Sequence, residues 1–319
     1  MRYLNYRGKR REAIAVYRNT AVIYNPSAGK LAGKGKRALE EARALLEKAG
    51  GKVSLVATTG PGTAGALARR AIAQGADLIL AAGGDGTVNE MLEGVVGSPV
   101  AFGVLPAGTA NVLATEAGIP ASVIRAAHAL ADYVPKRVSV GRLARDGASR
   151  HFLCMAGIGL DAHVVYHLSA PLKAKLGKAA YWVSAFSLVG RDLHEFEVTV
   201  DGRQHLCSFA LVSKVKNYGG DLTIASGASL LDDRFEVVLF EGRRAARYLK
   251  YLAGLAVKRL KGMSGVEILR ARRVEACCSP DARVYIQVDG EYAGRLPVRI
   301  EVVPDSLTLL LPPGYGFGS

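Results

Sequence analysis

The sequence predicts a doubly wound α/β domain followed by an antiparallel β-sandwich. Strand-like and helix-like segments alternate four times in about the first 130 residues. After Tyr133 the pattern changes to short segments of alternating hydrophobicity, separated by turn residues. The length of 319 residues suits two domains, since domains usually hold roughly 100–200 residues. We therefore expect one domain over 1–135 and a second over 136–304.

The first domain is expected to contain four strands, each followed by a helix. Apolar residues recur at helical spacing in residues 36–50, and Gly50 ends that segment. Residues 77–82 form a continuous apolar run, which is typical of a central parallel strand. The other expected strands end or lie at 13–24, 52–58 and 100–105, and the other helices follow the loops at 58–63, 83–87 and 106–111, with one more at 120–131.

The second domain is expected to be built from short strands. A helical insertion at 171–193 and a second helix at 243–261 interrupt them. The expected strand segments are 136–143, 151–160, 194–202, 207–215, 234–242, 273–279, 284–294, 297–304 and 306–312. Turn residues separate these segments at intervals that indicate a sandwich.

Charge and composition limit the function classes. The formal net charge is +14 and lies in two segments, 1–20 and 242–273, whereas the rest of the chain is balanced. Two basic segments on a neutral body indicate an anionic partner. No apolar run is long enough to span a bilayer, and the basic N-terminus lacks an apolar signal core. The four cysteines form no disulfide framework. We therefore expect a cytoplasmic protein with peripheral membrane association.

The strongest motif is GGDGTVNE at residues 83–90. It follows a buried-strand pattern and opens a helix, so its glycines allow a sharp turn and its helix N-terminus suits phosphate. Asp85 inside the turn suggests a divalent cation beside the phosphates. Thr87 and Asn89 can hydrogen-bond phosphate or metal-bound water. A Walker A pattern is absent from the sequence, which argues against a P-loop nucleotidase.

Two more turns rich in small polar residues follow strands, at 25–30 and 105–111. In a parallel sheet the carboxyl ends of the strands meet at one edge, where ligands bind. The three turns together therefore predict a nucleotide site.

These motifs resemble the diacylglycerol kinase catalytic domain family, and more closely its bacterial soluble lipid kinases, which are related to sphingosine and ceramide kinases. The resemblance covers essentially the whole chain. It rests on NPSAG, GGDGTVNE, LPAGTANVLA, GIGLDAHV at 157–164, LLDD at 230–233 and VDGE at 288–291.

The resemblance implies an ATP-dependent lipid kinase that uses Mg²⁺ and acts in the cleft between its domains on a diacylglycerol-like or sphingoid hydroxyl. It implies that residues 305–319 return to the first domain. The implied catalytic residues are Asp289, Glu291 and Asp85; the implied ATP-site residues are Asn25, Pro26, Ser27, Ala28, Gly29, Thr58, Gly84, Asp85, Gly86, Thr87, Val88, Asn89, Glu90 and Thr109; and the implied structural magnesium ligands are the carbonyls of Leu230 and Phe235 with the carboxylate of Asp233.

The sequence departs from the family at four positions. Val112 and Ser139 stand where many diacylglycerol kinases carry Asp, Thr63 stands where Asp is usual, and Arg234 stands where Gly is usual. An acidic network near Asp85 is therefore expected to be absent or rewired, and the magnesium site and the identity of the lipid stay open.

Other interpretations of the sequence remain. A strand followed by Asp289-Gly290 first indicates a hairpin turn. An NAD kinase-like phosphotransferase could share the same nucleotide edge, and a non-catalytic nucleotide- or lipid-binding protein would explain the missing acidic residues. Nucleic-acid binding is not expected, because no recognisable module accompanies the charge. A homodimer is compatible with the sequence.

Overall fold

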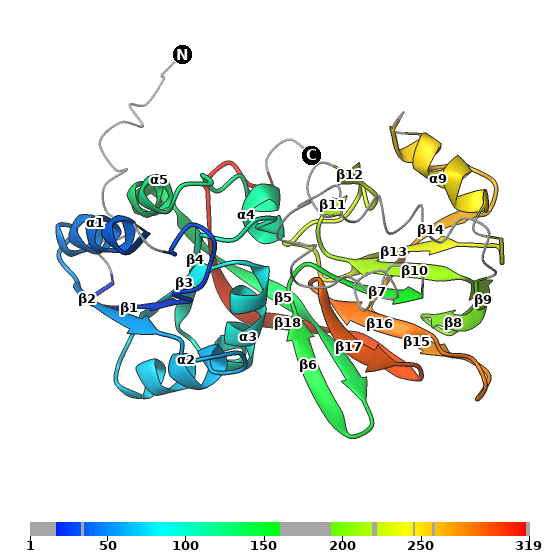
Figure 1. Cartoon of the computed structure of the whole chain (residues 1–319), viewed down its shortest axis with the longest axis horizontal. Helices are drawn as coiled ribbons and strands as arrows, with labels where there is room; N and C mark the ends of the chain where they lie inside the picture. Colours follow the sequence, from blue (N-terminus) through cyan, green and yellow to red (C-terminus); the bar gives the residue numbers. More distant parts are fainter. Residues whose placement is uncertain are drawn as a thin grey trace, which may run out of the picture. The chain divides into compact units, whose positions relative to one another are not determined.

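The computed structural model describes residues 17–32, 35–159, 193–218, 222–244, 246–256 and 259–316, and the chain divides into two units (Figure 1). The first unit holds Met1–Val138 and Asp305–Ser319, and the second holds Ser139–Pro304. The helix expected at 171–193, most of the first basic segment and part of the 157–164 motif lie outside the described residues.

The first unit is built on a parallel sheet in the order β2-β1-β3-β4-β18. Helices α2 and α3 lie against each other on one face of it, and α1 and α5 lie on the other (Figure 1). The strands are β1 (Asn19–Tyr24), β2 (Lys52–Ala57), β3 (Leu78–Gly83), β4 (Ala101–Pro106) and the end of β18 (Val298–Leu311); the helices are α1 (Gly35–Glu47), α2 (Ala64–Ala73), α3 (Asp85–Val95), α4 (Val112–Ala117), α5 (Val123–Ala129) and the short 3₁₀ helix η1 (Leu130–Asp132).

The burial of the strands explains their sequences. Every residue of β3 and β4 is buried, which accounts for their continuous apolar runs. From β1 the chain moves outward to β2 and then returns past β1 to β3. The order therefore reverses between β1 and β3, and a doubly wound sheet binds ligands beyond the carboxyl ends of the strands at such a point.

The second unit pairs two sheets of mainly antiparallel strands around one core. The first sheet has the order β14-β13-β10-β7-β16-β17, and β9-β8-β15 continue into the start of β18 in the second. Strand β5 pairs with β18 and with β6. The strands are β5 (Val134–Arg145), β6 (Ala148–Phe152), β7 (Met155–Gly159), β8 (Phe196–Val200), β9 (Arg203–Cys207), β10 (Phe209–Ser213), β11 (Asn217–Tyr218), β12 (Leu222–Thr223), β13 (Phe235–Phe240), β14 (Val266–Ala271), β15 (Arg273–Cys277), β16 (Tyr285–Val288) and β17 (Glu291–Arg295), with helix α9 (Ala246–Ala256).

Aromatic and branched side chains from both sheets fill this core. The rings of Phe152 and Phe235 stack with centroids 5.7 Å apart, and Phe196 is also fully buried. The predicted fold class, a doubly wound α/β domain followed by a β-sandwich, is confirmed.

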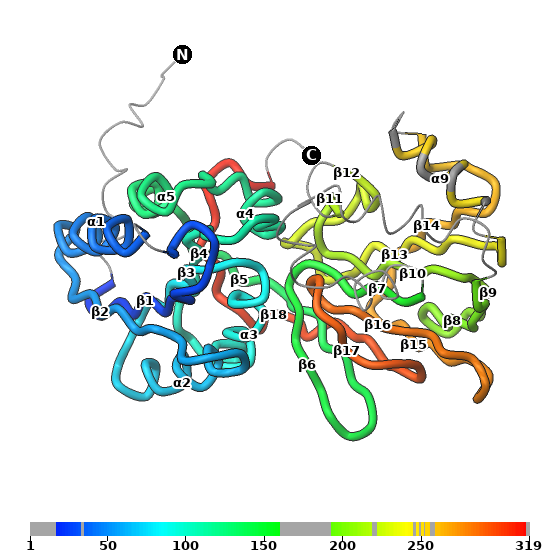
Figure 2. The backbone as a smooth tube through the Cα atoms, viewed as in Figure 1, coloured from blue at the N-terminus to red at the C-terminus, as the bar shows by residue number. Residues whose placement is uncertain are grey.

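One strand corrects the sequence prediction. The expected segments 297–304 and 306–312 form the single strand β18, whose early residues pair with β15 and whose Thr308 and Leu309 pair with β4. Pro304 lies between these two sets of pairs, so its missing N–H interrupts neither. Asp305 adopts a left-handed backbone conformation with φ of +46°. The sequence pattern around it therefore predicts a turn, although the strand continues through this position. In Figure 2 the end of this strand, in red, runs beside β4.

Candidate functional site

Backbone hydrogen bonds join three loops at the carboxyl edge of the first sheet. The carbonyl of Gly83 accepts from the N–H groups of Ala107 at 2.8 Å and Gly108 at 3.2 Å. The carbonyl of Ala82 accepts from the N–H of Asn25 at 3.1 Å, and Lys30 N–H donates to the carbonyl of Ala107 at 3.0 Å. The turns after β1, β3 and β4 therefore form one connected edge, which brings together most of the residues implied for the ATP site.

Gly84 and Gly108 at this edge are packed directly against each other. A Cβ placed on Gly108 would come within 2.5 Å of the Gly84 Cα, and one on Gly84 would come within 3.2 Å of the Gly108 Cα. No side chain fits between the two turns. Both glycines are partly exposed, and a backbone without side chains allows the close approach that phosphate binding requires.

Two polar side chains fix the shape of these turns. One carboxylate oxygen of Asp85 accepts from the N–H of Val112 at 2.7 Å, at the start of α4. Asn111, at φ +47°, accepts from Gly108 N–H at 3.0 Å and donates to the Gly108 carbonyl at 2.8 Å. Asp85 therefore links α3 to α4, whereas Asn111, which the sequence analysis did not assign to the site, closes the third turn. Its signal was the Asn of the LPAGTANVLA segment.

The other implied residues of α3 face the interior. Thr87, Val88 and Asn89 are buried, and Asn89 is 1% exposed. The Glu90 carboxylate accepts from the N–H of Ala64 at 3.2 Å, at the start of α2. These four side chains fix the position of α3. The implied ATP-site residues that solvent reaches are Asn25, Pro26, Ser27, Gly29, Thr58, Gly84, Asp85, Gly86, Glu90 and Thr109, whereas Ala28 is buried.

Asp289 forms the first position of a tight hairpin in the second unit. Asp289 and Gly290 have φ of +48° and +83° and join β16 to β17, so the hairpin interpretation holds for the backbone. The Asp289 carboxylate accepts from three backbone N–H groups, those of Leu153 at 3.1 Å, Cys154 at 3.0 Å and Met155 at 2.9 Å. Asp289 therefore ties this hairpin to the turn before β7.

Glu291 lies in a different environment. Its side chain is 43% exposed and forms an ion pair with Arg150 of β6. Both residues are partly exposed, but the Asp289 carboxylate accepts from three backbone N–H groups, whereas the Glu291 carboxylate pairs with a side chain.

The residues implied for structural magnesium lie around the loop before β13. Leu230 is buried, Phe235 is the first residue of β13, and the exposed Asp233 carboxylate pairs with Arg272. A hydrogen bond from Arg272 holds the pKa of Asp233 below its ordinary value. The same loop also contacts a fully buried lysine, Lys214, which the sequence analysis did not single out. Its signal was a charged residue inside the apolar segment 207–215.

Burial lowers the pKa of Lys214 to about 8, although Asp232 and Asp233 partly oppose the shift. The side chain is therefore mainly an ammonium at neutral pH. Among the described residues, no group of three or more His, Cys, Asp or Glu side chains is arranged to hold a metal ion.

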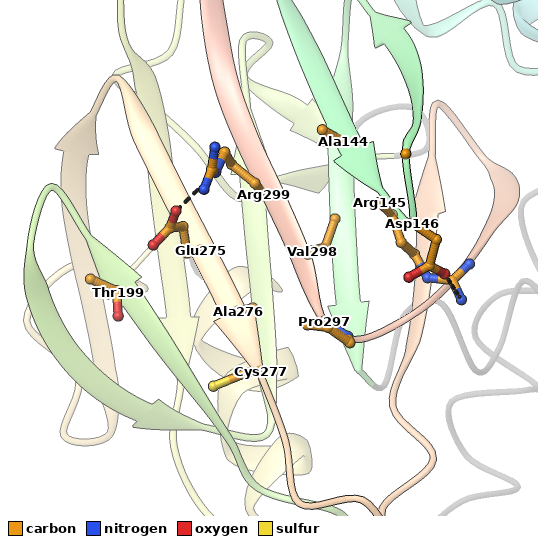
Figure 3. A pocket seen from close by; sticks show the side chains of 11 residues that line it. Ala144, Arg145, Asp146, Thr199, Glu275, Ala276, Cys277, Pro297, Val298 and Arg299 are labelled. Atoms are coloured by element: carbon orange, nitrogen blue, oxygen red, sulfur yellow. Dashed lines mark hydrogen bonds and ion pairs between the residues drawn. The ribbon is translucent and has the colours of Figure 1, made fainter.

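A cavity of about 490 Å³ opens in the second unit among residues of β5, β15 and β18 (Figure 3). The Glu275 carboxylate on its wall accepts from Arg299 at 2.9 Å and also from Arg273, which holds the pKa of Glu275 below its ordinary value. Its described lining includes none of the implied catalytic, ATP or magnesium residues.

Both units match known families. Residues 19–143 match the diacylglycerol kinase catalytic domain, and residues 154–311 match the YegS C-terminal NAD kinase beta sandwich-like domain. A sandwich alone therefore does not separate this chain from NAD kinases. Among the described residues, no helix is long and apolar enough to cross a membrane.

Curated relatives and solved structures agree with these matches. The chain is 30% identical to a diacylglycerol kinase of Staphylococcus aureus strain MRSA252 over 86% of this chain and 87% of that one. It is 29% identical to the diacylglycerol kinase of Bacillus subtilis over 86% and 90%. A diacylglycerol kinase structure from Bacillus anthracis matches with a TM-score of 0.76 at 23% identity, over 94% of this chain and 99% of that one, and another from that organism gives 0.80 at 22%, over 94% and 98%.

The fold, the connected glycine turns and these relatives support a kinase. The chain belongs to the diacylglycerol kinase catalytic domain family.

Proposed function

We propose that this protein transfers the γ-phosphoryl group of ATP to a lipid hydroxyl of the diacylglycerol or sphingoid class. The observation that carries the proposal is the connected edge of the first unit, where the Gly84 and Gly108 backbones approach within van der Waals contact. Phosphoryl transfer depends mainly on positioning and charge neutralisation, and rigid backbone turns supply the first of these.

The triphosphate is held by the turns at 25–29, 84–86 and 109. The backbone N–H groups at the start of α3 lie at the positive end of the helix dipole, and this arrangement suits phosphate. One carboxylate oxygen of Asp85 holds Val112, and the carboxylate supplies negative charge for a magnesium ion or its waters. Magnesium bound with the nucleotide would neutralise charge on the transferred group.

Glu291 is the proposed proton acceptor for the lipid hydroxyl. Its side chain is 43% exposed and pairs with Arg150, which orients the carboxylate. Asp289, with three backbone donors on its carboxylate, acts instead as the positioning residue of the hairpin that carries Glu291. The proposal therefore divides the two implied catalytic carboxylates into one acid–base residue and one structural residue.

Contact with the lipid is proposed to occur at an anionic membrane surface. Arg244, Arg247 and Lys250 are exposed on and just before α9, within the basic segment 242–273. Other cations of that segment are used inside the unit, since Arg270 pairs with Asp232 and Arg272 with Asp233. The proposed docking surface, here called the α9 surface, consists of Arg244, Arg247 and Lys250.

The test is a transfer assay with γ-labelled ATP, magnesium and a panel of acceptors. The panel contains diacylglycerol, monoacylglycerol, phosphatidylglycerol, sphingosine, ceramide, undecaprenol and NAD. Label in one lipid supports the proposal. Label in NAD alone would instead identify a nucleotide kinase, and nucleotide binding with no transfer to any acceptor would identify a binding protein.

A further inference from the structure

Lys214 lies directly after β10 and is 0% exposed. Its ammonium donates to the Oγ of Ser139 at 2.6 Å and to the backbone carbonyl of Asp232. The Ser139 hydroxyl in turn donates to the same carbonyl at 2.6 Å. A single buried cation therefore joins β5, the end of β10 and the loop before β13, which are far apart in the sequence.

Two arginines also pair with the acidic side chains of that loop. The Asp232 carboxylate pairs with Arg270, and the Asp233 carboxylate pairs with Arg272. Both arginines flank the end of β14, which pairs with β13 through Ala271 and Phe235. The loop from 230 to 235 is therefore held by an ammonium on its backbone and by guanidinium groups on its carboxylates.

These contacts do not fit the structural magnesium ion implied by the resemblance. Magnesium requires oxygen ligands in near-octahedral geometry and keeps several waters. Here the one carboxylate of the implied ligand set, that of Asp233, is engaged by Arg272, and a positive charge sits on the adjacent carbonyl of Asp232. Arg234, in place of the usual glycine, adds another positive charge to the loop. A divalent ion here would meet like charges rather than free ligands.

Ser139, which accepts from the Lys214 ammonium, also differs from the residue that the resemblance implies. Ser139 stands where the resemblance implies Asp in the first strand of this domain. A hydroxyl can accept from a buried ammonium and donate to a carbonyl at once, as it does here. We propose that the Lys214 ammonium, bonded to Ser139 and to the Asp232 carbonyl, replaces the structural divalent cation in this chain, so that the loop 230–235 is held without metal.

The experiment is thermal unfolding of the full-length, nucleotide-free protein in EDTA and in millimolar magnesium. The wild type is expected to unfold at the same temperature in both. Lys214→Met removes the hydrogen bonds from the ammonium to the Ser139 hydroxyl and the Asp232 carbonyl, and is expected to lower the midpoint by roughly 5 °C in both buffers. Lys261→Met, the same change at an exposed lysine of the same unit, is expected to leave the midpoint unchanged.

Two results would overturn the proposal. One is a magnesium-dependent rise in the wild-type midpoint that Asp233→Asn abolishes, because it would show a metal bound at the implied ligands. The other is a Lys214→Met midpoint equal to that of the wild type. The wild-type comparison stands even where Lys214→Met fails to fold. Because the readout is stability without nucleotide, failure here is distinct from failure of the proposed kinase activity.

Discussion

At the scale of single residues, the pair Asp-Gly turns the chain at three hairpins of the part that the structure describes. Asp146, Asp201 and Asp289 all adopt positive φ, and a glycine with positive φ follows each of them. The carboxylates then differ in use. That of Asp146 pairs with Arg145, that of Asp201 accepts from the N–H groups of Arg272 and Arg273, and that of Asp289 accepts from three N–H groups. A shared local motif therefore serves different tertiary contacts.

Replacing Asp289 by Asn is expected to lower the free energy of unfolding by about 1–3 kcal/mol. Asn tolerates the left-handed backbone, so the change isolates the carboxylate. One acceptor oxygen becomes an NH₂ group that faces a backbone donor. Chemical denaturation measures the effect, and Asp146→Asn, at an exposed turn of the same type, is expected to change stability by less than about 0.5 kcal/mol. Equal losses in the two variants would contradict the anchoring role.

Replacing Glu291 by Gln is expected to reduce turnover by roughly 10²–10⁴-fold, the usual contribution of a general base. Affinity for ATP, measured by calorimetry, should stay constant because Gln keeps the size and shape of Glu and the glycine turns of the first unit are unchanged. The matched control is Glu301→Gln, which breaks another arginine ion pair of the same unit. Near-normal turnover in Glu291→Gln would assign proton transfer to another group.

At the scale of elements, the candidate nucleotide edge depends on loops that contact one another closely. The turns after β3 and β4 leave no space for a side chain between Gly84 and Gly108. The shape of each turn therefore depends on the other turn. A change in one turn should affect the binding of a ligand that contacts both.

Gly108→Ala tests this dependence. The added Cβ would lie 2.5 Å from the Gly84 Cα, so the two turns must separate. A distortion that costs about 1.4 kcal/mol weakens binding roughly tenfold, and we expect at least this loss of Mg-ATP affinity by calorimetry. Gly314→Ala, with no atom within 4 Å of the new Cβ, is the control. Unchanged affinity in Gly108→Ala would place the phosphates elsewhere.

The α9 surface makes a separate prediction. Replacing Arg244, Arg247 and Lys250 by Gln should weaken binding to phosphatidylglycerol vesicles, since each cation near an anionic surface contributes about 1 kcal/mol. Wild-type binding should also fall with salt, because screening shortens the reach of the charges.

The matched control removes the same number of cations, Lys36, Arg37 and Arg43, from α1, where Glu41 and Glu47 pair with the two arginines. Vesicle sedimentation is expected to separate the two triple variants. Equal binding by both, or binding that salt does not affect, would argue against docking through this surface.

At the scale of the whole molecule, the parts predictable from sequence were those governed by local patterns. Hydrophobic periodicity and turn residues predicted the alternating strands and helices of the first unit and the short strands of the second. These patterns depend only on which residues of each segment are buried, so they can be recognised within the segment itself. The contacts of Lys214 were not predictable, since Ser139 and Asp232 reach it from distant strands and loops. For the same reason the sequence could not distinguish the contacts of the Asp289 carboxylate from those of the Glu291 carboxylate.

Strand β18 provides the whole-molecule prediction. Leu309 is 1% exposed and pairs with Phe102 of β4. Leu309→Ala is expected to destabilise the protein by about 2–5 kcal/mol, the usual cost of a buried leucine. Val134→Ala, at a 37% exposed position of the same unit, should cost less than about 0.5 kcal/mol. A small effect at Leu309 would show that the first unit is stable without the end of β18.

The position of β18 in the chain also has a consequence for biosynthesis. The ribosome makes β4, residues 101–106, early. The strand that pairs with β4 through Thr308 and Leu309 is made much later. Roughly 200 residues separate the two, and at about 5–20 residues per second a ribosome needs on the order of 10–40 s to make them. During that interval the nascent first unit carries a fully apolar strand with an open edge, which is prone to pair with other chains. The sheet of the first unit is therefore completed late, long after β4 has been made.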